Sequence, residues 1–354
     1  IDINIDQDYI TNIGENWPVK FVNTKIDDTY ITIQFTENLN LQGSQYFIIG
    51  SEYITIDGQN NTVNFTFTTS GLIQNGFDNN NGFSNITIKN IGITNNQNAN
   101  LNSREGWLCQ QYFGRGISSG TIVIENCYTT GDVSDTVAGG IAGRYLGRNM
   151  YGGSITIQNC YTTGDINDED AGGIAGASLG RDMSDGSITI QNCYATGEIS
   201  DKGAGGIAGK YLGNRMTGGS ITIQNCYTTG EISGNSAGGI AGTGVGDSMT
   251  DGSITIQNNM YNNNGGKPLI GSISNSDYLT TNNNNKQSNN TWSDENAFNT
   301  IYVEDAWGKA TGLNRWLLQS NVEEPYDLLI IIEKNEDNTM KTTIIKSVTI
   351  IQND

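Results

Sequence analysis

The sequence has no histidine, few prolines and little positive charge. Its 354 residues include 3 prolines, and 18 basic residues stand against 37 acidic ones, for a net charge of −19. The lack of histidine removes the commonest general base and metal ligand. The negative charge predicts repulsion from nucleic acid and from anionic membranes, so we expect neither as a partner. No run of 18 apolar residues occurs, so we expect no membrane insertion.

The repeated segments contain no ten-residue run with the 3.6-residue apolar spacing of an amphipathic helix. This argues against ankyrin repeats, although the chain shares their period of about 33 residues. Glycine (46 residues), asparagine, threonine and isoleucine are abundant instead. Because Ile-Thr-Ile segments beside asparagine are typical of strands and turns, we predict an all-β fold.

One motif occurs four times at a spacing of 33 residues, without insertion. A representative copy begins at Gly153 and reads GSITIQNCYTTGDINDEDAGGIAGASLGRDMSD. Weaker copies of its Ile-x-Ile pattern extend the array back toward Tyr30, with steps of 32 and 36 residues before the regular ones. A constant period places equivalent side chains in columns along one axis, which predicts a solenoid whose repeats contact only their neighbours.

Each repeat contains three strand-like pieces, represented by Ile155–Ile157, Cys160–Thr163 and Gly172–Gly176. Three strands per 33-residue coil, joined by tight corners, predict a right-handed parallel β-helix with terminal caps. The hand follows from the general rule for parallel crossover connections. We expect about eight coils. A repeat of this kind is stable only when it stacks on its neighbours.

The repeat pattern divides the chain into three regions. We assign residues 1–29 to an N-terminal cap and 30–260 to the β-helix, with the regular repeats at about 120–258. Residues 261–354 are assigned to a C-terminal capping or attachment region. That region begins where Asn259 takes the position of the repeated cysteine and the Gly-Gly-Ile-Ala-Gly block ends.

Two columns are predicted to be structural ladders. Asparagine tolerates the left-handed conformation of a tight corner, and stacked amides can bond along the axis. The asparagine column comprises Asn126, Asn159, Asn192, Asn225 and Asn258. The cysteine column comprises Cys127, Cys160, Cys193 and Cys226. Because parallel side chains resist the dihedral angle of a disulfide, we expect these thiols and Cys109 to be free, with the column buried.

The residues Asn192–Gly197 read Asn-Cys-Tyr-Ala-Thr-Gly and are followed by Gly-Gly-Ile-Ala-Gly at Gly205–Gly209. This pair closely resembles the GLUG motif, in which the second block is Gly-Gly-Leu-Val-Gly. The resemblance covers about 120–260 and, more loosely, 50–260. It implies a non-catalytic β-helical stretch of a large secreted or surface protein, adhesin-like in some bacteria.

Two columns of carboxylates run along the predicted helix. The first comprises Asp132, Asp165, Glu198 and Glu231, and the second comprises Asp135, Asp168 and Asp201. Like charges about 5 Å apart repel one another unless water or cations screen them. We interpret the columns as a solvated acidic face, and the alternative is weak calcium binding by the first column. No other cofactor is assigned.

A column of tyrosines is the candidate glycan-contact surface. Exposed rings beside an acidic ladder could hold a sugar chain along the axis, and the alternative is that the rings stack on one another and cover the sheet. The column comprises Tyr128, Tyr161, Tyr194 and Tyr227. Candidate N-glycosylation sites are the sequons at Asn60, Asn64, Asn85 and Asn289.

No convergent acid–base pair, activated nucleophile or phosphate-binding loop is visible, and we assign no catalytic residue. We therefore predict a non-enzymatic structural protein of an extracellular cell or virion surface or fibre, adhesive or self-assembling into a larger assembly. Two alternatives stay open: a polysaccharide-processing β-helix enzyme of the tailspike or lyase type, and a calcium-stabilised glycan-binding module. Because the chain begins at Ile1, we expect a mature or trimmed product.

Overall fold

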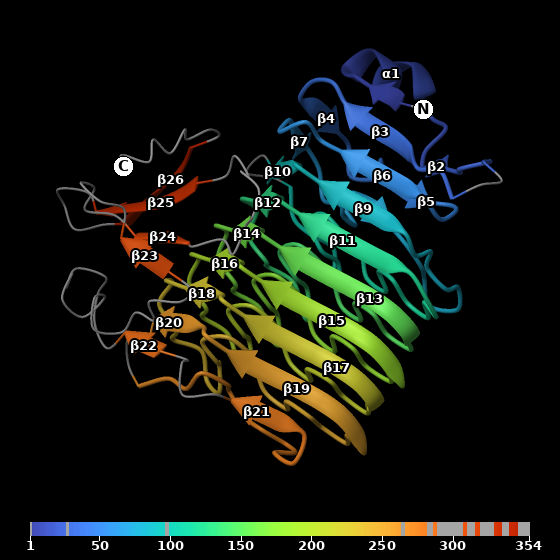
Figure 1. Ribbon diagram of the computed structural model, residues 1–354. Helices are drawn as coiled ribbons and strands as arrows, with labels where there is room; N and C mark the ends of the chain where they lie inside the picture. The colour runs from blue at the N-terminus through green and yellow to red at the C-terminus, as the bar shows by residue number, and fades with distance from the viewer. Residues whose placement is uncertain are drawn as a thin grey trace, which may run out of the picture.

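The computed structural model describes residues 2–25, 28–95, 99–262 and 266–281, together with the backbone of five later strands. These residues wind into a parallel β-solenoid of about eight turns, with about 33 residues in each coil (Figure 1). The predicted all-β fold class and the stacking of repeats along one axis are confirmed.

One long sheet runs the length of the solenoid, and each of its strands is parallel to the next (Figure 1). Its ten strands are β1 (Asp2–Ile5), β3 (Ile31–Phe35), β6 (Ile54–Asp57), β9 (Ile86–Lys89), β11 (Thr121–Glu125), β13 (Tyr151–Gln158), β15 (Asp185–Gln191), β17 (Thr217–Gln224), β19 (Asp251–Gln257) and β21 (Leu279–Thr281). Ile56 pairs with Ile88 and Ile88 pairs with Ile124, which confirms the unequal steps before the regular repeats.

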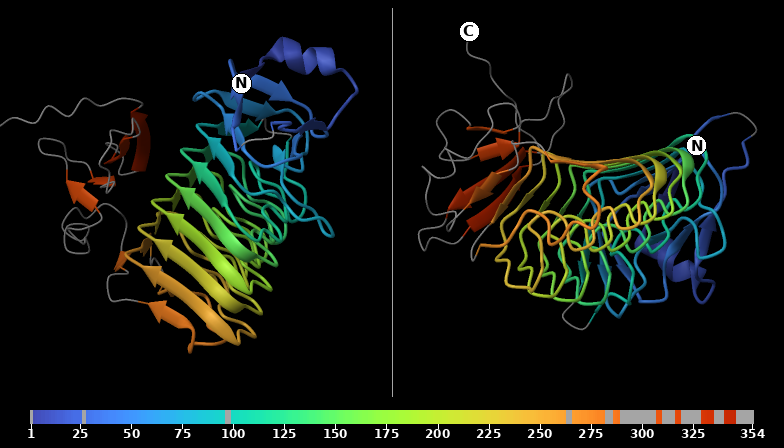
Figure 2. Two further views of the ribbon diagram at one scale, coloured as in Figure 1. Left: turned by 45° about the vertical axis from the view of Figure 1, so that its right-hand side comes forward. Right: turned by 90° about the horizontal axis from the view of Figure 1, so that it is seen from below.

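A second parallel sheet follows the asparagine corner of each coil. Its nine strands are β4 (Leu39–Leu41), β7 (Thr62–Phe65), β10 (Gly92–Asn95), β12 (Tyr128–Thr129), β14 (Tyr161–Thr162), β16 (Tyr194–Ala195), β18 (Tyr227–Thr228), β20 (Met260–Asn262) and β22 (Lys286–Ser288). Figure 2 shows the coils from the side and from below, with the bends between the sheets lined up along the axis.

The third side of the solenoid changes character along the axis. In the first coils it is a sheet of three strands, β2 (Val19–Phe21), β5 (Phe47–Ile49) and β8 (Ile73–Gln74). In the regular coils it continues as single bridges, such as those from Cys109 to Ala142 and from Ala142 to Ala175. The chain bends sharply there, and the carbonyl of Ile174 accepts from the backbone N–H of both Ile141 (3.0 Å) and Ala142 (2.9 Å).

Glycine on this side is required by close packing of neighbouring coils. Gly206 does not have a positive φ. A Cβ atom at this position would collide with the carbonyl oxygen of Gly239 and with the methyl group of Thr228. The repeated glycines therefore let adjacent coils approach each other at the third side.

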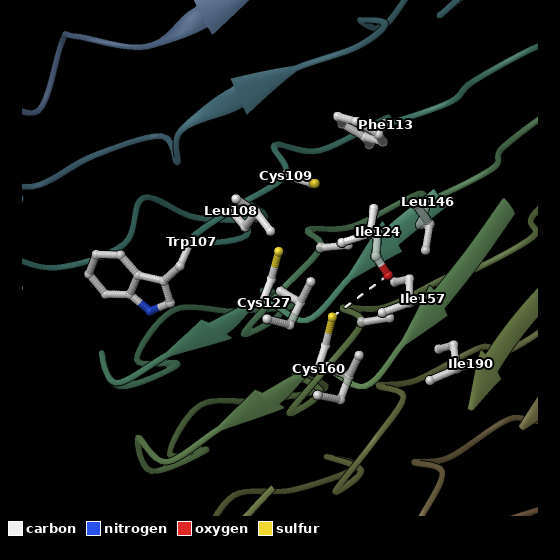
Figure 3. Packing of buried hydrophobic residues seen from close by; sticks show 14 of the residues in the cluster. Trp107, Leu108, Cys109, Phe113, Ile124, Cys127, Leu146, Ile157, Cys160 and Ile190 are labelled. Carbon is white, nitrogen blue, oxygen red and sulfur yellow. Dashed lines mark hydrogen bonds between the residues drawn. The ribbon is translucent and has the colours of Figure 1, made fainter. Parts of the chain in front are cut away.

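Alternation along each strand fills the interior with isoleucine. Ile155 and Ile157 are completely buried on β13, whereas the residues between and after them are half-buried. Figure 3 shows Ile124, Ile157 and Ile190 in successive coils beside the thiols of Cys127 and Cys160. Full burial of one isoleucine contributes about 2 kcal/mol, so the stacked columns supply much of the stability of each coil.

The two ends of the array extend the parallel sheets beyond the predicted interval 30–260. Before it, β1 and β2 join the long and third sheets, and helix α1 (Gln7–Ile13) is capped by the side chain of Asp6. After it, β21 and β22 join the long and second sheets. The assignment of 1–29 and 261–354 as cap and attachment regions stays a prediction.

The later part of the chain contains a separate antiparallel sheet. Its strands are β23 (Trp307–Lys309), β24 (Trp316–Leu318), β25 (Leu329–Lys334) and β26 (Met340–Ile345). Within the described ranges, α1 is the sole helix and spans seven residues. No helix there has the length and apolar character needed to cross a membrane.

Candidate functional site: the stacked side-chain columns

The tyrosine column is a continuous stack on the second sheet. Its successive ring centroids lie 5.0, 4.7 and 4.7 Å apart, with interplanar angles of 8°, 2° and 7°. The stack joins Tyr128, Tyr161, Tyr194 and Tyr227. The in-register pairing of β12, β14, β16 and β18 sets this spacing, because equivalent residues are paired directly with each other. The predicted stacking of the rings on one another is confirmed.

The expectation that these rings are exposed is wrong for three of the four. Tyr161, Tyr194 and Tyr227 are only 6%, 1% and 1% exposed, and Tyr128 is half-buried. Burial raises the pKa of Tyr128, Tyr161 and Tyr194, and the hydroxyl of Tyr194 is buried without a hydrogen-bond partner. A glycan would reach the edge of Tyr128 most easily, and glycan contact by the column stays a prediction.

The asparagine column forms the corner between the long and second sheets. Its five members have left-handed φ angles of 53° or 54°, as the corner requires. Hydrogen bonds of 3.3 Å from each Nδ2 to the preceding Oδ1 join Asn90, Asn126, Asn159 and Asn192. Asn225 and Asn258 keep the same backbone conformation. The structural role predicted for this column is thus supported by both its dihedral angles and its amide ladder.

A second amide ladder, not predicted from the sequence, lies one position before the corner. The Nε2 atom of Gln158 donates to Glu125 at 2.8 Å. The next three steps, at 2.9, 3.0 and 2.9 Å, join Gln158, Gln191, Gln224 and Gln257. The signal was present in the sequence, because glutamine follows the second isoleucine in four successive copies of the motif, at positions 158, 191, 224 and 257.

The cysteine column lies inside the solenoid, and its thiols are free. All five cysteines of the chain, including Cys109, are buried and unpaired with one another. The Sγ atom of Cys160 donates to the carbonyl of Gln158 at 3.2 Å and lies 3.7 Å from that of Ile124 (Figure 3). Burial raises the pKa of Cys109, Cys127, Cys160 and Cys193 well above the ordinary value. These thiols are therefore protonated and pack as small apolar groups.

The first acidic column bonds to the backbone of the following coil. The Oδ1 atom of Asp132 accepts from the backbone N–H of Asp165 at 3.0 Å, and that of Asp165 accepts from Glu198 at 2.9 Å. Glu198 in turn accepts from the hydroxyl of Ser233 at 3.0 Å. Glu231 occupies the next position, exposed to solvent. Each of these hydrogen bonds offsets part of the repulsion between stacked carboxylates.

The second acidic column has a similar local role. Asp135, Asp168 and Asp201 each accept the backbone N–H of the next residue, at 2.7, 2.6 and 2.6 Å. Within the described ranges, no three histidine, cysteine or carboxylate side chains gather around a point where a metal ion could bind. Calcium binding by the first column stays a prediction that the geometry does not test.

The candidate glycosylation sites differ in exposure. Asn60 is exposed, whereas Asn64 and Asn85 are half-buried and hydrogen-bonded to neighbouring coils. Asn289 lies outside the described residues. Of the three described sequons, Asn60 is therefore the most accessible acceptor.

Two basic residues that looked isolated in the sequence each form an ion pair in the structure. Lys210 forms an ion pair with Asp170 at 2.8 Å, and Arg215 forms one with Asp182 at 3.0 Å. Lys210 and Arg215 both depart from the repeat pattern and lie on the same loop, whereas their acidic partners lie in the preceding coil. Comparisons with protein-family models, with curated proteins and with solved structures each give no match to the chain.

Proposed function

We propose that the chain is a non-enzymatic structural protein of an extracellular cell or virion surface or fibre. The supporting observation is the regular stack of side chains at one-coil spacing, represented by Tyr161 against Tyr194 at 4.7 Å and Gln158 against Gln191 at 2.9 Å. A column of identical groups gives an elongated and uniform surface. An active site instead needs unlike groups that converge on one point.

The resemblance to GLUG repeats supports the same proposal. It depends on the Asn-Cys-Tyr-Ala-Thr-Gly and Gly-Gly-Ile-Ala-Gly blocks, which lie at the asparagine corner and at the closely packed third side. Both blocks therefore occupy positions where the solenoid needs those residue types. Membership of that family is part of this proposal, and it implies a display or adhesive role.

The partner that we propose for this chain is another copy of itself. The ends of a solenoid present unpaired strand edges, which can pair with another copy unless they are covered. The net charge of −19 opposes close packing of sides and binding to nucleic acid or anionic membranes. We therefore propose end-to-end contacts within a larger surface assembly.

Surface labelling tests this function. Antibodies raised against the recombinant chain are applied to intact source cells or virions, and to permeabilised ones as a control. Labelling of intact particles is the expected result, and labelling that needs permeabilisation would contradict the surface role. Sedimentation velocity over a range of concentrations tests self-assembly, which a concentration-independent monomer would contradict.

A further inference from the structure

The loops that lead from the third side into the long sheet contain most of the arginine in the chain. Six of the seven arginines lie between positions 104 and 215, although the net charge of the chain is −19. Successive loops are joined by backbone hydrogen bonds, such as that from Tyr145 N to Ala177 O at 3.0 Å. The side chains of neighbouring loops are therefore held about one coil apart.

Three guanidinium groups surround the ring of Tyr145. Their central carbons lie 4.1 Å (Arg144), 4.9 Å (Arg148) and 5.5 Å (Arg181) from the ring centroid. The Nη1 atom of Arg181 also donates to the hydroxyl of Tyr145 at 3.2 Å. Because these separations are within cation–π range, the ring holds several positive charges in one place.

The carboxylates near these arginines are too few to balance them. Asp182 lies 3.4 Å from Arg148, 3.5 Å from Arg181 and 3.0 Å from Arg215, so three guanidinium groups share one carboxylate. Asp78 contacts Arg148 at 3.8 Å and supplies the second negative charge. The sharing leaves an excess of positive charge at this face.

Arg144 increases that excess. The ion pairs within the described part of the chain do not include it, and its Nε atom is buried without a hydrogen-bond partner. Burial lowers the pKa of Arg144, contact with Tyr145 opposes this, and the charges of Arg104 and Arg181 lower it further. Glu105 lies close enough to Arg104 for their charges to interact, so five guanidinium groups stand against three carboxylates. We call this set the arginine cluster: Arg104, Arg144, Arg148, Arg181 and Arg215.

The arginine cluster is partly exposed to solvent, and a further aromatic ring lies on the loop of Arg215. The side chains of Arg148 and Arg181 are 23% and 24% exposed, and that of Arg215 is 58% exposed. Tyr211 precedes Arg215 on the same loop, is 36% exposed, and has the Nζ atom of Lys210 at 4.8 Å from its ring centroid. Lys210 is paired with Asp170 at 2.8 Å, so the unbalanced positive charge near Tyr211 is that of the arginine cluster.

We propose that the arginine cluster and Tyr211 form a binding site for an acidic polysaccharide. Guanidinium groups bind carboxylate or sulfate groups through paired hydrogen bonds, and Arg148, Arg181 and Arg215 supply them here. The face of a sugar ring lies against Tyr211. The negative net charge of the chain does not prevent this binding, because acidic groups more than about 8 Å away are screened at physiological salt.

A polysaccharide fits this surface better than a nucleic acid does. Duplex DNA carries a charge about every 1.7 Å along its axis and would meet the acidic remainder of the chain. A polysaccharide with about one acidic group per sugar places fewer negative charges against that acidic surface. The site does not depend on the structural role proposed above, since surface labelling can succeed when polysaccharide binding fails, and the reverse.

Binding of defined polymers to the full chain tests the site. Calorimetric titrations use polygalacturonate as the carboxylate probe and heparin as the sulfate probe, with neutral dextran and single-stranded DNA as comparisons. We expect at least one acidic polysaccharide to bind, more weakly as salt is raised, and dextran not to bind. The stronger of the two acidic probes identifies the acidic group that the site prefers.

Two exposed substitutions and one matched control locate the site. Arg215→Gln and Tyr211→Ala should each weaken binding about tenfold, equivalent to about 1.4 kcal/mol. Lys20→Gln removes the same charge from an exposed position on β2 and should leave the affinity unchanged. Circular dichroism checks that all three variants keep the native fold.

Three results would overturn the proposal. The first is that neither acidic polysaccharide binds at low salt. The second is that Arg215→Gln and Lys20→Gln have equal effects, which would mean that binding depends on total charge. The third is that single-stranded DNA binds as tightly as the best polysaccharide and is indifferent to Tyr211→Ala.

Discussion

Replacing Gly206 tests whether close packing at the third side holds the coils together. An added methyl group at this position would collide with the carbonyl oxygen of Gly239 and the methyl of Thr228, and would reach Cδ1 of Ile199 at 3.0 Å. The carbonyl belongs to the backbone of the next coil, so it cannot rotate away. The two coils must therefore separate locally.

The expected loss of stability follows from these contacts. Overpacking of this kind costs about 1 to 3 kcal/mol. Separation of the coils also weakens the hydrogen bond from Gly206 N to Gly238 O (3.2 Å), worth about 1 kcal/mol. Alanine also restricts the unfolded chain more than glycine does, which offsets about 0.5 kcal/mol of the loss. Gly206→Ala should thus lower the free energy of unfolding by about 2 to 3 kcal/mol, and Gly206→Val by more.

Urea denaturation followed by circular dichroism measures this change. Gly14→Ala is the control, because Gly14 has a φ of +60° but open space around its Cα. Because its ψ is −117°, outside the left-handed helical region, backbone strain alone should cost Gly14→Ala about 1 to 3 kcal/mol. No loss for Gly206→Ala, or a loss for Gly206→Val no larger than that for Gly206→Ala, would refute the view that close packing between coils requires glycine.

Three further predictions concern buried or half-buried side chains of the solenoid. Burial raises the pKa of Glu105 to about 7 despite hydrogen bonds from Gln111, so its contribution to stability is complete below pH 4.5 and is lost as pH rises through 7. Glu105→Gln should therefore recover up to about 3 kcal/mol in unfolding measurements at pH 8 and little at pH 4, and an unchanged pH profile would contradict this. Asn192→Ala should cost about 2 kcal/mol from its left-handed φ of 54° and its 3.3 Å ladder bond, and Asn192→Gly should cost less because glycine keeps the conformation. The five free, buried thiols should react with a thiol reagent only after denaturation. Fast labelling of the native protein would show that the column is open.

The sequence was sufficient to predict the repeated architecture. The Ile155–Ile157 alternation, the asparagine corner and the constant period each depend on local chemistry that recurs in every coil. Because the copies are in register, one correct assignment applies to all of them. The free cysteine column was predictable for the same reason, since parallel thiols one coil apart do not meet the geometry of a disulfide.

The surface features were harder to predict, because they depend on contacts between segments. Alternation places Tyr194 on the face opposite Cys193, but it does not reveal what lies over that face, and the ring is 1% exposed. The arginine cluster depends on the path of irregular loops. Arg148 and Arg215 are 67 positions apart in the sequence, yet both contact Asp182.

The most direct test of the account is to incubate the chain with acidic polysaccharides and examine both partners. Binding is measured with and without calcium, and the size of the recovered polysaccharide is compared with that of an untreated sample. The account predicts a polysaccharide that is bound and recovered at its original length. Time-dependent shortening in proportion to the amount of protein would contradict the central claim that this solenoid displays a binding surface without catalysis.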